Sequence, residues 1–132
     1  MKKRGSVAVA AMSMVAVVGL AGPAFASGNF DWDGVFKHRL DSRTYRANHG
    51  THTIWKYTAN CPGPGDLVQI RLVRENFGPD TNFAWKDYHC GDANISRQWN
   101  SPYDDDHHFS VEKADTSDET EYWYVSGETY YP

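Results

Sequence analysis

Short runs of alternating apolar and polar residues, separated by glycine, proline, asparagine and aspartate, constrain the fold of this chain more than any other feature. The clearest run is residues 66–75, in which Val68, Ile70 and Leu72 alternate with polar residues. A period of two places alternate side chains on opposite faces of a strand. No stretch after residue 26 shows the period of a helix. The pattern therefore predicts half-buried strands.

The spacing of these runs predicts an all-β domain over residues 35–132. The expected strands are residues 35–40 with a continuation at 43–47, then 51–58, 66–75, 82–90, 93–99, 107–113 and 121–131, the last one bent at Gly127. Residues 115–119 read as a charged hairpin loop. About seven to eight strands at such spacing are typical of a small antiparallel β-sandwich, jelly-roll or immunoglobulin-like.

Residues 1–26 have the order of a secretory signal peptide. A basic start at residues 2–4 precedes an uncharged apolar stretch at residues 7–20, and Ala24 and Ala26 stand three and one positions before the expected cut. The apolar stretch is shorter than the roughly 18 residues that a membrane-spanning helix needs. We therefore expect a secreted, extracellular product without membrane insertion.

The acidic balance narrows the classes of partner. The chain has 13 basic and 17 acidic residues, and residues 1–26 hold three of the basic ones and none of the acidic ones. Residues 27–132 therefore carry a net charge of −7 instead of −4. This charge repels phosphate backbones and anionic membranes, so we expect neither nucleic-acid nor membrane binding.

Cys61 and Cys90 are the only cysteines. An even pair in an exported chain predicts a disulfide, because the compartment is oxidising. Closing a loop of this length is expected to stabilise the fold by roughly 3–4 kcal/mol. The alternative is a catalytic thiol, which is disfavoured because nothing in the sequence marks either cysteine as activated.

Residues 27–34 stand apart from the strand pattern. In them Phe30 and Trp32 alternate with Asp31 and Asp33, with Gly28 before and Gly34 after this stretch. The prediction is a flexible N-terminal arm, the usual state of a new chain end. The alternative is an extended arm that adds a strand to a partner, with Phe30 and Trp32 as anchors.

Aromatic side chains suggest a second candidate contact. Most of the 18 rings in residues 27–132 are expected in the core. Trp123 lies between two tyrosines on a predicted strand, so either Trp123 or its neighbours face outward. Trp123 is therefore a candidate partner-binding residue, and such a surface suits a protein or a sugar.

Residues 104–108 form the densest polar cluster, Asp-Asp-Asp-His-His. Asp104, Asp106 and His107 are the weak metal candidates in it. Their spacing matches no calcium loop, and adjacent histidines on a strand point to opposite faces. A solvated acidic loop without metal is the better prediction, and no cofactor is expected.

A small hydrolase such as a ribonuclease needs a base, an acid and cations for the phosphate. The chain has six histidines. Its other ingredients are Glu75, Glu112, Arg71, Arg74 and Arg97. No nucleophile-elbow, zinc-protease or Walker signature accompanies them. The prediction is that the protein is not an enzyme.

The order of landmarks is similar to that of small secreted actinobacterial β-sandwich proteins. The landmarks are Thr-His-Thr-Ile at 51–54, Cys61, Val-Gln-Ile-Arg-Leu-Val-Arg at 68–74, Cys90, Trp99, Phe109 and Gly-Glu-Thr-Tyr-Tyr-Pro at 127–132. They cover most of residues 27–132. Some of these proteins resemble the adaptor subunits of umbrella-type secreted toxin particles. The resemblance implies that this protein joins other subunits, with residues 27–34 as the natural insert.

The sequence as a whole predicts a secreted, non-catalytic binding protein. The expected partner is another extracellular protein, within an assembly in which this chain is an adaptor. The alternatives are a carbohydrate-binding module and a small secreted hydrolase such as a ribonuclease.

Overall fold

Ten β-strands and no helix make up the computed structural model, which describes residues 27–63, 65–115 and 121–132. The strands are β1 (Gly28–Phe36), β2 (Arg39–Asp41), β3 (Tyr45–Ala47), β4 (Gly50–Asn60), β5 (Leu67–Arg74), β6 (Thr81–Asn82), β7 (Lys86–His89), β8 (Ile95–Ser101), β9 (Asp105–Lys113) and β10 (Trp123–Tyr131). The expected leader at residues 1–26 and residues 116–119 of the expected hairpin loop lie outside the described residues. No helix that is long and apolar enough to cross a membrane occurs in the described ranges.

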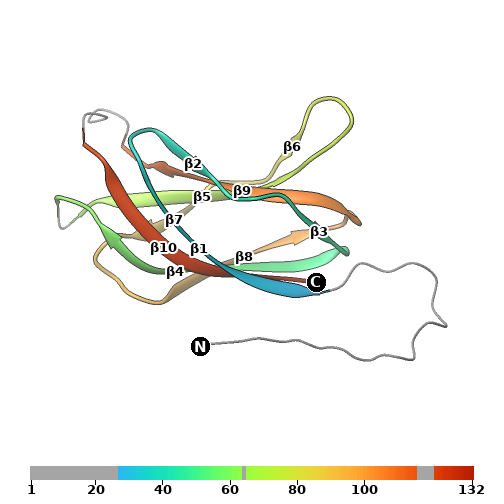
Figure 1. The fold of residues 1–132 in the computed structure, drawn as a ribbon, viewed down its shortest axis with the longest axis horizontal. Helices are drawn as coiled ribbons and strands as arrows, with labels where there is room; N and C mark the ends of the chain where they lie inside the picture. Colours follow the sequence, from blue (N-terminus) through green and yellow to red (C-terminus); the bar gives the residue numbers. More distant parts are fainter. Residues whose placement is uncertain (1–26, 64, 116–120) are drawn as a thin grey trace.

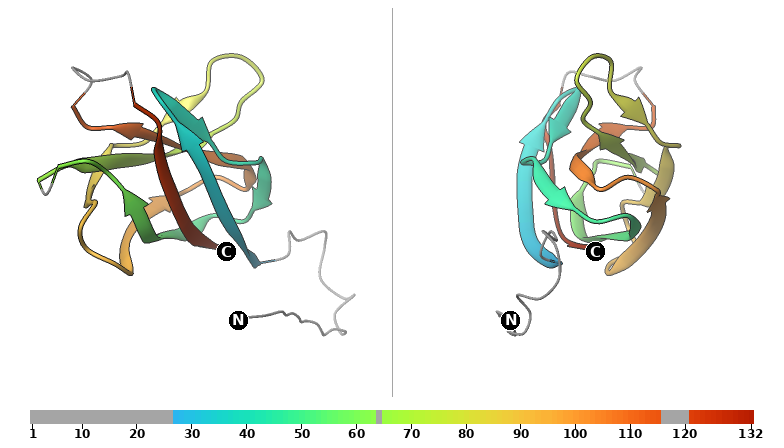
Figure 2. Two further views of the ribbon diagram at one scale, coloured as in Figure 1. Left: turned by 60° about the vertical axis from the view of Figure 1, so that its left-hand side comes forward. Right: turned by 90° about the vertical axis from the view of Figure 1, so that its right-hand side faces the viewer.

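The strands form two antiparallel sheets (Figures 1 and 2). A four-stranded sheet has the order β1-β10-β4-β8, and a six-stranded sheet has the order β2-β9-β5-β6, with β3 also paired to β9 and β7 to β5. The first and last strands lie side by side, as Figure 1 shows, and are in register from Gly28 opposite Tyr131 to Phe36 opposite Trp123. The prediction of an all-β, antiparallel two-sheet fold is confirmed, with ten strands where seven to eight were expected.

The core lies between the two sheets and follows the predicted alternation. Val68, Ile70 and Leu72 of β5 point inward and are fully buried. The inward positions of the other strands complete this cluster with Phe36, Tyr45, Ile54, Tyr88, Trp99, Phe109, Val111, Trp123 and Val125. Burial of these side chains is the main stabilising contribution to the fold.

The predicted disulfide is confirmed. Cys61 follows the end of β4 and Cys90 follows the end of β7, with their Cα atoms 6.1 Å apart. Because β4 belongs to the four-stranded sheet and β7 to the six-stranded sheet, the bond ties the two layers together.

The prediction of a flexible arm at residues 27–34 is wrong for all but its first residue. Gly28 to Gly34 belong to β1, which pairs with β10 along its whole length. Phe30 and Trp32 alternate with Asp31 and Asp33, and the two rings pack against the core. Burial of two large rings offsets the entropy lost when the segment is ordered.

Two other predicted strands are broken. The run at 35–40 bends at Lys37 and His38, because the chain passes there from the four-stranded to the six-stranded sheet. The run at 82–90 divides into β6 and β7. Between them the carbonyl oxygen of Ala84 accepts a hydrogen bond from Trp99 Nε1 at 2.8 Å, so this stretch pairs with a core side chain in place of a strand.

Candidate functional site

The four-stranded sheet presents an outward face with an unusual set of side chains. Along β10, Trp123 and Val125 are buried, whereas Tyr124 and Tyr130 are exposed. We call the following outward residues the aromatic–acidic face: Trp55 and Tyr57 of β4, Tyr124, Glu128 and Tyr130 of β10, and Asp31 and Asp33 of β1. No lysine or arginine occupies an outward position of these four strands.

Strand register brings the aromatic and acidic residues together. Glu128 lies directly opposite Asp31 on one side and Trp55 on the other. The rings of Trp55 and Tyr57 are 6.5 Å apart between centroids. With Tyr130 they border an open hollow of about 500 Å³, which Thr53 and Asn94 complete.

Hydrogen bonds fix the acidic centre of the face. Glu128 is 9% exposed, and its Oε1 accepts a hydrogen bond from the Tyr57 hydroxyl at 2.5 Å. Its Oε2 accepts one from Asn29 Nδ2 at 2.7 Å. Burial, and then the hydrogen bond and charge of Glu128, raise the pKa of Tyr57, so its hydroxyl remains a donor. Tyr57 and Asn29 thus hold the Glu128 carboxylate in one orientation.

Among the described residues, the carboxylates of this face lack a basic partner. Within the described residues, no lysine, arginine or histidine forms an ion pair with Asp31, Asp33 or Glu128. Asp31 and Glu128 are like charges directly opposite each other, an arrangement that destabilises a sheet. The face therefore carries an uncompensated negative charge.

The outer side of the six-stranded sheet is different because its charges pair with one another. Arg39 Nε lies 2.8 Å from Asp41 Oδ1, and Arg39 Nη1 lies 3.8 Å from Glu112 Oε2. Arg74 Nη2 is 3.0 Å from Asp105 Oδ2. These groups satisfy each other within the fold, so this side offers a partner less unpaired charge.

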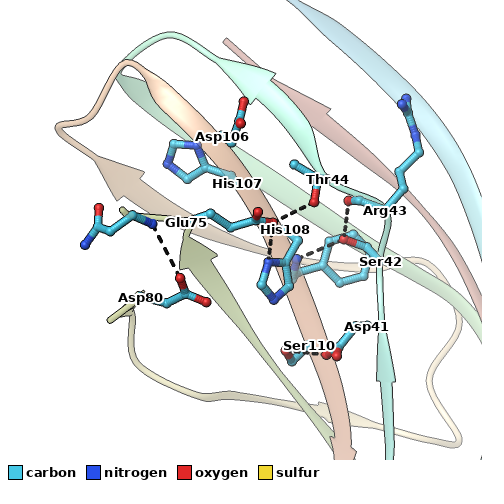
Figure 3. Close-up of polar contacts among 12 residues, drawn as sticks. Asp41, Ser42, Arg43, Thr44, Glu75, Asp80, Asp106, His107, His108 and Ser110 are labelled. Atoms are coloured by element: carbon cyan, nitrogen blue, oxygen red, sulfur yellow. Dashed lines mark hydrogen bonds and ion pairs between the residues drawn. The ribbon is translucent and has the colours of Figure 1, made fainter. Parts of the chain in front are cut away.

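The six-stranded sheet also holds the closest approach to an acid–base arrangement (Figure 3). Glu75 Oε2 accepts hydrogen bonds from Thr44 Oγ1 at 2.6 Å and from His108 Nδ1 at 2.8 Å. The Thr44 hydrogen bond is the largest cause of the lowered pKa of Glu75. Phosphodiester cleavage needs a base and an acid on either side of the reacting group. Here Glu75 and His108 bond directly to each other, so the carboxylate orients the imidazole.

The arginines considered for a phosphate site do not converge. Arg71 stacks over the Trp85 ring at 4.4 Å, Arg74 pairs with Asp105, and Arg97 lies over the Tyr88 ring at 5.3 Å. Each guanidinium thus has its own partner. Glu112, the other candidate carboxylate, lies near Arg39.

The structure places the predicted partner-binding residues inward. Phe30 and Trp32 are partly buried, with ring centroids 6.3 and 5.0 Å from that of Phe109. Trp123 is 5% exposed and packs against Phe36. Trp123 is therefore not an exposed contact residue in this structure, because Tyr124 occupies the outward face of that segment.

The residues considered for metal binding have separate partners. Asp104 accepts hydrogen bonds from the backbone N–H of His49 at 2.6 Å and contacts its Nδ1 at 2.8 Å. Asp106 pairs with Arg46 at 3.3 Å. His107 is buried, with Nε2 2.9 Å from Ser101 Oγ. Within the described ranges, no three histidine, cysteine, aspartate or glutamate side chains gather as metal ligands.

The aromatic–acidic face was not predicted because β4 inverts the usual pattern. His52 and Lys56 are buried, whereas Trp55 and Tyr57 face outward. Lys56 is tolerated inside because its Nζ donates hydrogen bonds to the carbonyl oxygens of Cys90 and Asp92. The available signal was the alternation of tryptophan and tyrosine with histidine and lysine, which left the inward side of the strand ambiguous.

Neither the family models nor the curated proteins give a match for this chain, so inference of its function depends on the geometry and charge of the aromatic–acidic face.

Proposed function

We propose that the protein is a secreted, non-catalytic binding module whose aromatic–acidic face docks a second extracellular protein. The observation that carries this proposal is the meeting of four outward aromatic rings with three carboxylates that have no basic partner among the described residues. Tyrosine and tryptophan are enriched at the centres of protein interfaces, where a few such residues supply most of the binding energy.

Charge defines the kind of partner. Residues 27–132 carry a net charge of −7, and Asp31, Asp33 and Glu128 add a local concentration of negative charge. A partner with lysine or arginine at the matching positions relieves the repulsion between Asp31 and Glu128. Such complementarity also accelerates encounter at low ionic strength.

Rigidity supports the same proposal. The aromatic residues lie on hydrogen-bonded strands, and Glu128 is held by Tyr57 and Asn29. A surface that is already ordered loses less conformational entropy on binding than a mobile loop does. The expected mode is therefore docking of a preformed surface with little backbone change.

A carbohydrate ligand is the second candidate, and the hollow bordered by Trp55, Tyr57 and Tyr130 favours it. Aromatic rings can cover the apolar face of a sugar ring, while Thr53 and Asn94 offer polar groups for its hydroxyls. A neutral glycan makes no use of the uncompensated carboxylates, which is why the protein partner is preferred.

The test is capture of partners from the producing organism's culture supernatant with the tagged protein. Trp55→Ala and Tyr130→Ala are expected to reduce capture by about tenfold or more. Phe77→Ala is the matched control, because Phe77 is an exposed aromatic residue outside the face. Raising the salt concentration is expected to weaken capture further.

Two results count against a protein partner. One is recovery of the wild-type protein alone and as a monomer, and the other is a loss of capture in Phe77→Ala as large as the loss in Trp55→Ala. Retention on a neutral polysaccharide that is lost in Trp55→Ala and is insensitive to salt supports the carbohydrate candidate instead.

A further inference from the structure

A slot opens between the two sheets along β1 and the segment that follows β2. Its volume is about 260 Å³, and Phe30, Trp32, Leu40 and Phe109 form its apolar floor. Small-molecule pockets usually measure about 300–1,000 Å³. This slot is smaller, and its size suits one or two side chains of a larger partner.

The slot lies beside an edge of β1 that no strand of the described residues pairs. β1 is the terminal strand of the four-stranded sheet, and β10 is its one strand partner within the described residues. The other edge of β1 therefore carries backbone N–H and C=O groups that no strand of the described chain pairs. An extended peptide can satisfy these groups by adding a strand to the sheet.

The rim of the slot is mainly acidic. Asp31, Asp33 and Asp41 line it, and Arg43 is the one basic residue in the lining. The guanidinium of Arg43 stacks over the Phe30 ring at 4.2 Å. Asp41 is already bonded to Arg39 and Ser110. The unpaired negative charge is therefore that of Asp31 and Asp33, which flank Trp32 on the outward side of β1.

From these features we infer that the free edge of β1 binds an extended segment of a partner protein in which apolar and basic residues alternate. Successive side chains of a strand point to opposite faces of the sheet. Apolar residues of the added strand enter the slot above Phe109, and lysine or arginine residues lie beside Asp31 and Asp33. The inference extends the proposed function by a second contact surface, distinct from the rings of the aromatic–acidic face.

The same charges exclude a second copy of this chain as the occupant. Pairing β1 with β1 of another copy brings the Asp31 and Asp33 carboxylates of both copies close together. Like charges across paired strands are destabilising. Charged residues on an edge strand are also a common device against self-association. Charge repulsion thus disfavours pairing of β1 with β1 of a second copy, whereas a strand with basic residues is attracted.

Binding of synthetic peptides to the purified protein tests this inference. The probe is a peptide of about seven residues, a typical strand length, that alternates lysine with valine. The controls alternate glutamate with valine, or carry proline at the centre of the lysine–valine sequence. Amide chemical shifts from nuclear magnetic resonance report where each peptide binds. The expected result is shifts along β1 with the lysine–valine peptide and with neither control.

Variants separate the slot from general charge attraction. Asp31→Lys is expected to weaken binding of the lysine–valine peptide by about tenfold. Asp87→Lys, the same charge reversal on an exposed position of β7, is expected to leave it unchanged. Leu40→Trp fills the slot without a change of charge, and peptide binding is expected to be lost while the amide spectrum remains that of a folded sheet.

Three results overturn the inference: no binding of the lysine–valine peptide, equal binding of the glutamate–valine peptide, or shifts confined to β8 at the opposite edge of the sheet. These failures are distinguishable from failure of the proposed function. Loss of supernatant capture in Trp55→Ala tests the aromatic rings, and it is unaffected by whether a peptide binds along β1.

Discussion

Individual buried polar residues in this fold are matched to specific partners. The Tyr45 hydroxyl lies 2.9 Å from His52 Nδ1, and His107 lies between Ser101 Oγ and the carbonyl oxygen of Asp105. His52 Nε2 has no hydrogen-bond partner among the described residues. The single contact to Tyr45 is therefore the polar contact on which burial of His52 depends.

Replacing Tyr45 by phenylalanine tests this dependence. Tyr45→Phe keeps the ring and leaves His52 without a hydrogen bond, so the free energy of unfolding is expected to fall by about 1–3 kcal/mol. The control is Tyr124→Phe, whose exposed hydroxyl contacts Asp33 at 3.4 Å and is expected to contribute little. Urea denaturation of both variants measures the difference. Equal stabilities would contradict the assignment.

The two buried histidines predict how stability depends on pH. Their ring centroids are 4.5 Å apart. Burial, and secondarily the charge of His107, lower the pKa of His52 to about 3, and burial lowers that of His107. The unfolded chain titrates near pH 6.5 and therefore binds protons that the folded chain does not bind. The contribution of the two neutral histidines to the free energy of unfolding is therefore fully present above pH 6.5, and it is lost as the pH falls toward 3.

At pH 5 protonation of His52 in the unfolded chain is alone expected to lower the free energy of unfolding by roughly 2 kcal/mol. Urea denaturation between about pH 7.5 and pH 5 measures this change. The carboxylates with lowered pKa values, such as Glu75 and Asp105, act at lower pH and do not enter this window. His52→Leu should show a weaker pH dependence. A flat profile in the wild-type protein would refute the prediction.

At the scale of the strands, close backbone approach determines where a side chain is tolerated. The register between β10 and β4 shifts between Ser126 and Gly127, where Tyr57 is an extra residue on β4. A Cβ atom at Gly127 would lie 1.9 Å from the carbonyl oxygen of Trp55 and 2.6 Å from the Trp32 ring. Glycine at this position therefore lets β10 pass β4 above the Trp32 ring.

Gly127→Ala is expected to destabilise the protein by about 3 kcal/mol or more, because β4 or β10 has to move. Gly91→Ala is the control, since a Cβ atom there meets nothing within 4 Å. Thermal unfolding of the two variants checks the prediction. A melting temperature for Gly127→Ala that equals that of Gly91→Ala is the result that rejects it.

The disulfide links the end of β4 in one sheet to the end of β7 in the other. Cys61 and Cys90 are separated by 29 residues along the chain. Reduction, or replacement of both cysteines by serine, is expected to lower the free energy of unfolding by about 3 kcal/mol in the chain-entropy model. Denaturation with and without a reductant measures this. An unchanged midpoint would show that the bond contributes nothing to stability.

The sequence predicted those strands whose two faces differ clearly. Residues 66–75 alternate cleanly, and the observed β5 is close to the predicted range. β1 was missed because its terminal glycines and its acidic outward residues resemble a solvated tail, and its pairing with β10 depends on residues about 100 positions away. The aromatic–acidic face was missed for the same reason, since Asp31, Glu128 and Trp55 meet only through strand register.

At the scale of the whole molecule, the two sheets have different surfaces. The six-stranded sheet pairs its own charges, whereas the four-stranded sheet leaves Asp31, Asp33 and Glu128 without basic partners among the described residues. Binding surfaces often retain such destabilising features because function requires them. If the face has the proposed function, the protein is expected to be less stable than a variant in which these opposed carboxylates are removed.

Asp31→Asn tests this balance between stability and binding. Removing one of two opposed carboxylates is expected to raise the free energy of unfolding by about 0.5 kcal/mol. The same change is expected to weaken capture of a basic partner. Denaturation and capture from supernatant are measured on one preparation. If stability and capture both fall, the Asp31 carboxylate has a structural role that the cross-strand repulsion does not describe.

The pairing of β1 with β10 also determines when the protein can acquire its structure during synthesis. The four-stranded sheet pairs Gly28 with Tyr131, so the sheet cannot close until β10 has been synthesised. Pairing of such distant segments is slow, typically milliseconds to seconds for all-β domains. A chain that stops before Trp123 lacks the strand between β1 and β4. The aromatic–acidic face of the nascent protein is therefore incomplete until β10 has left the ribosome.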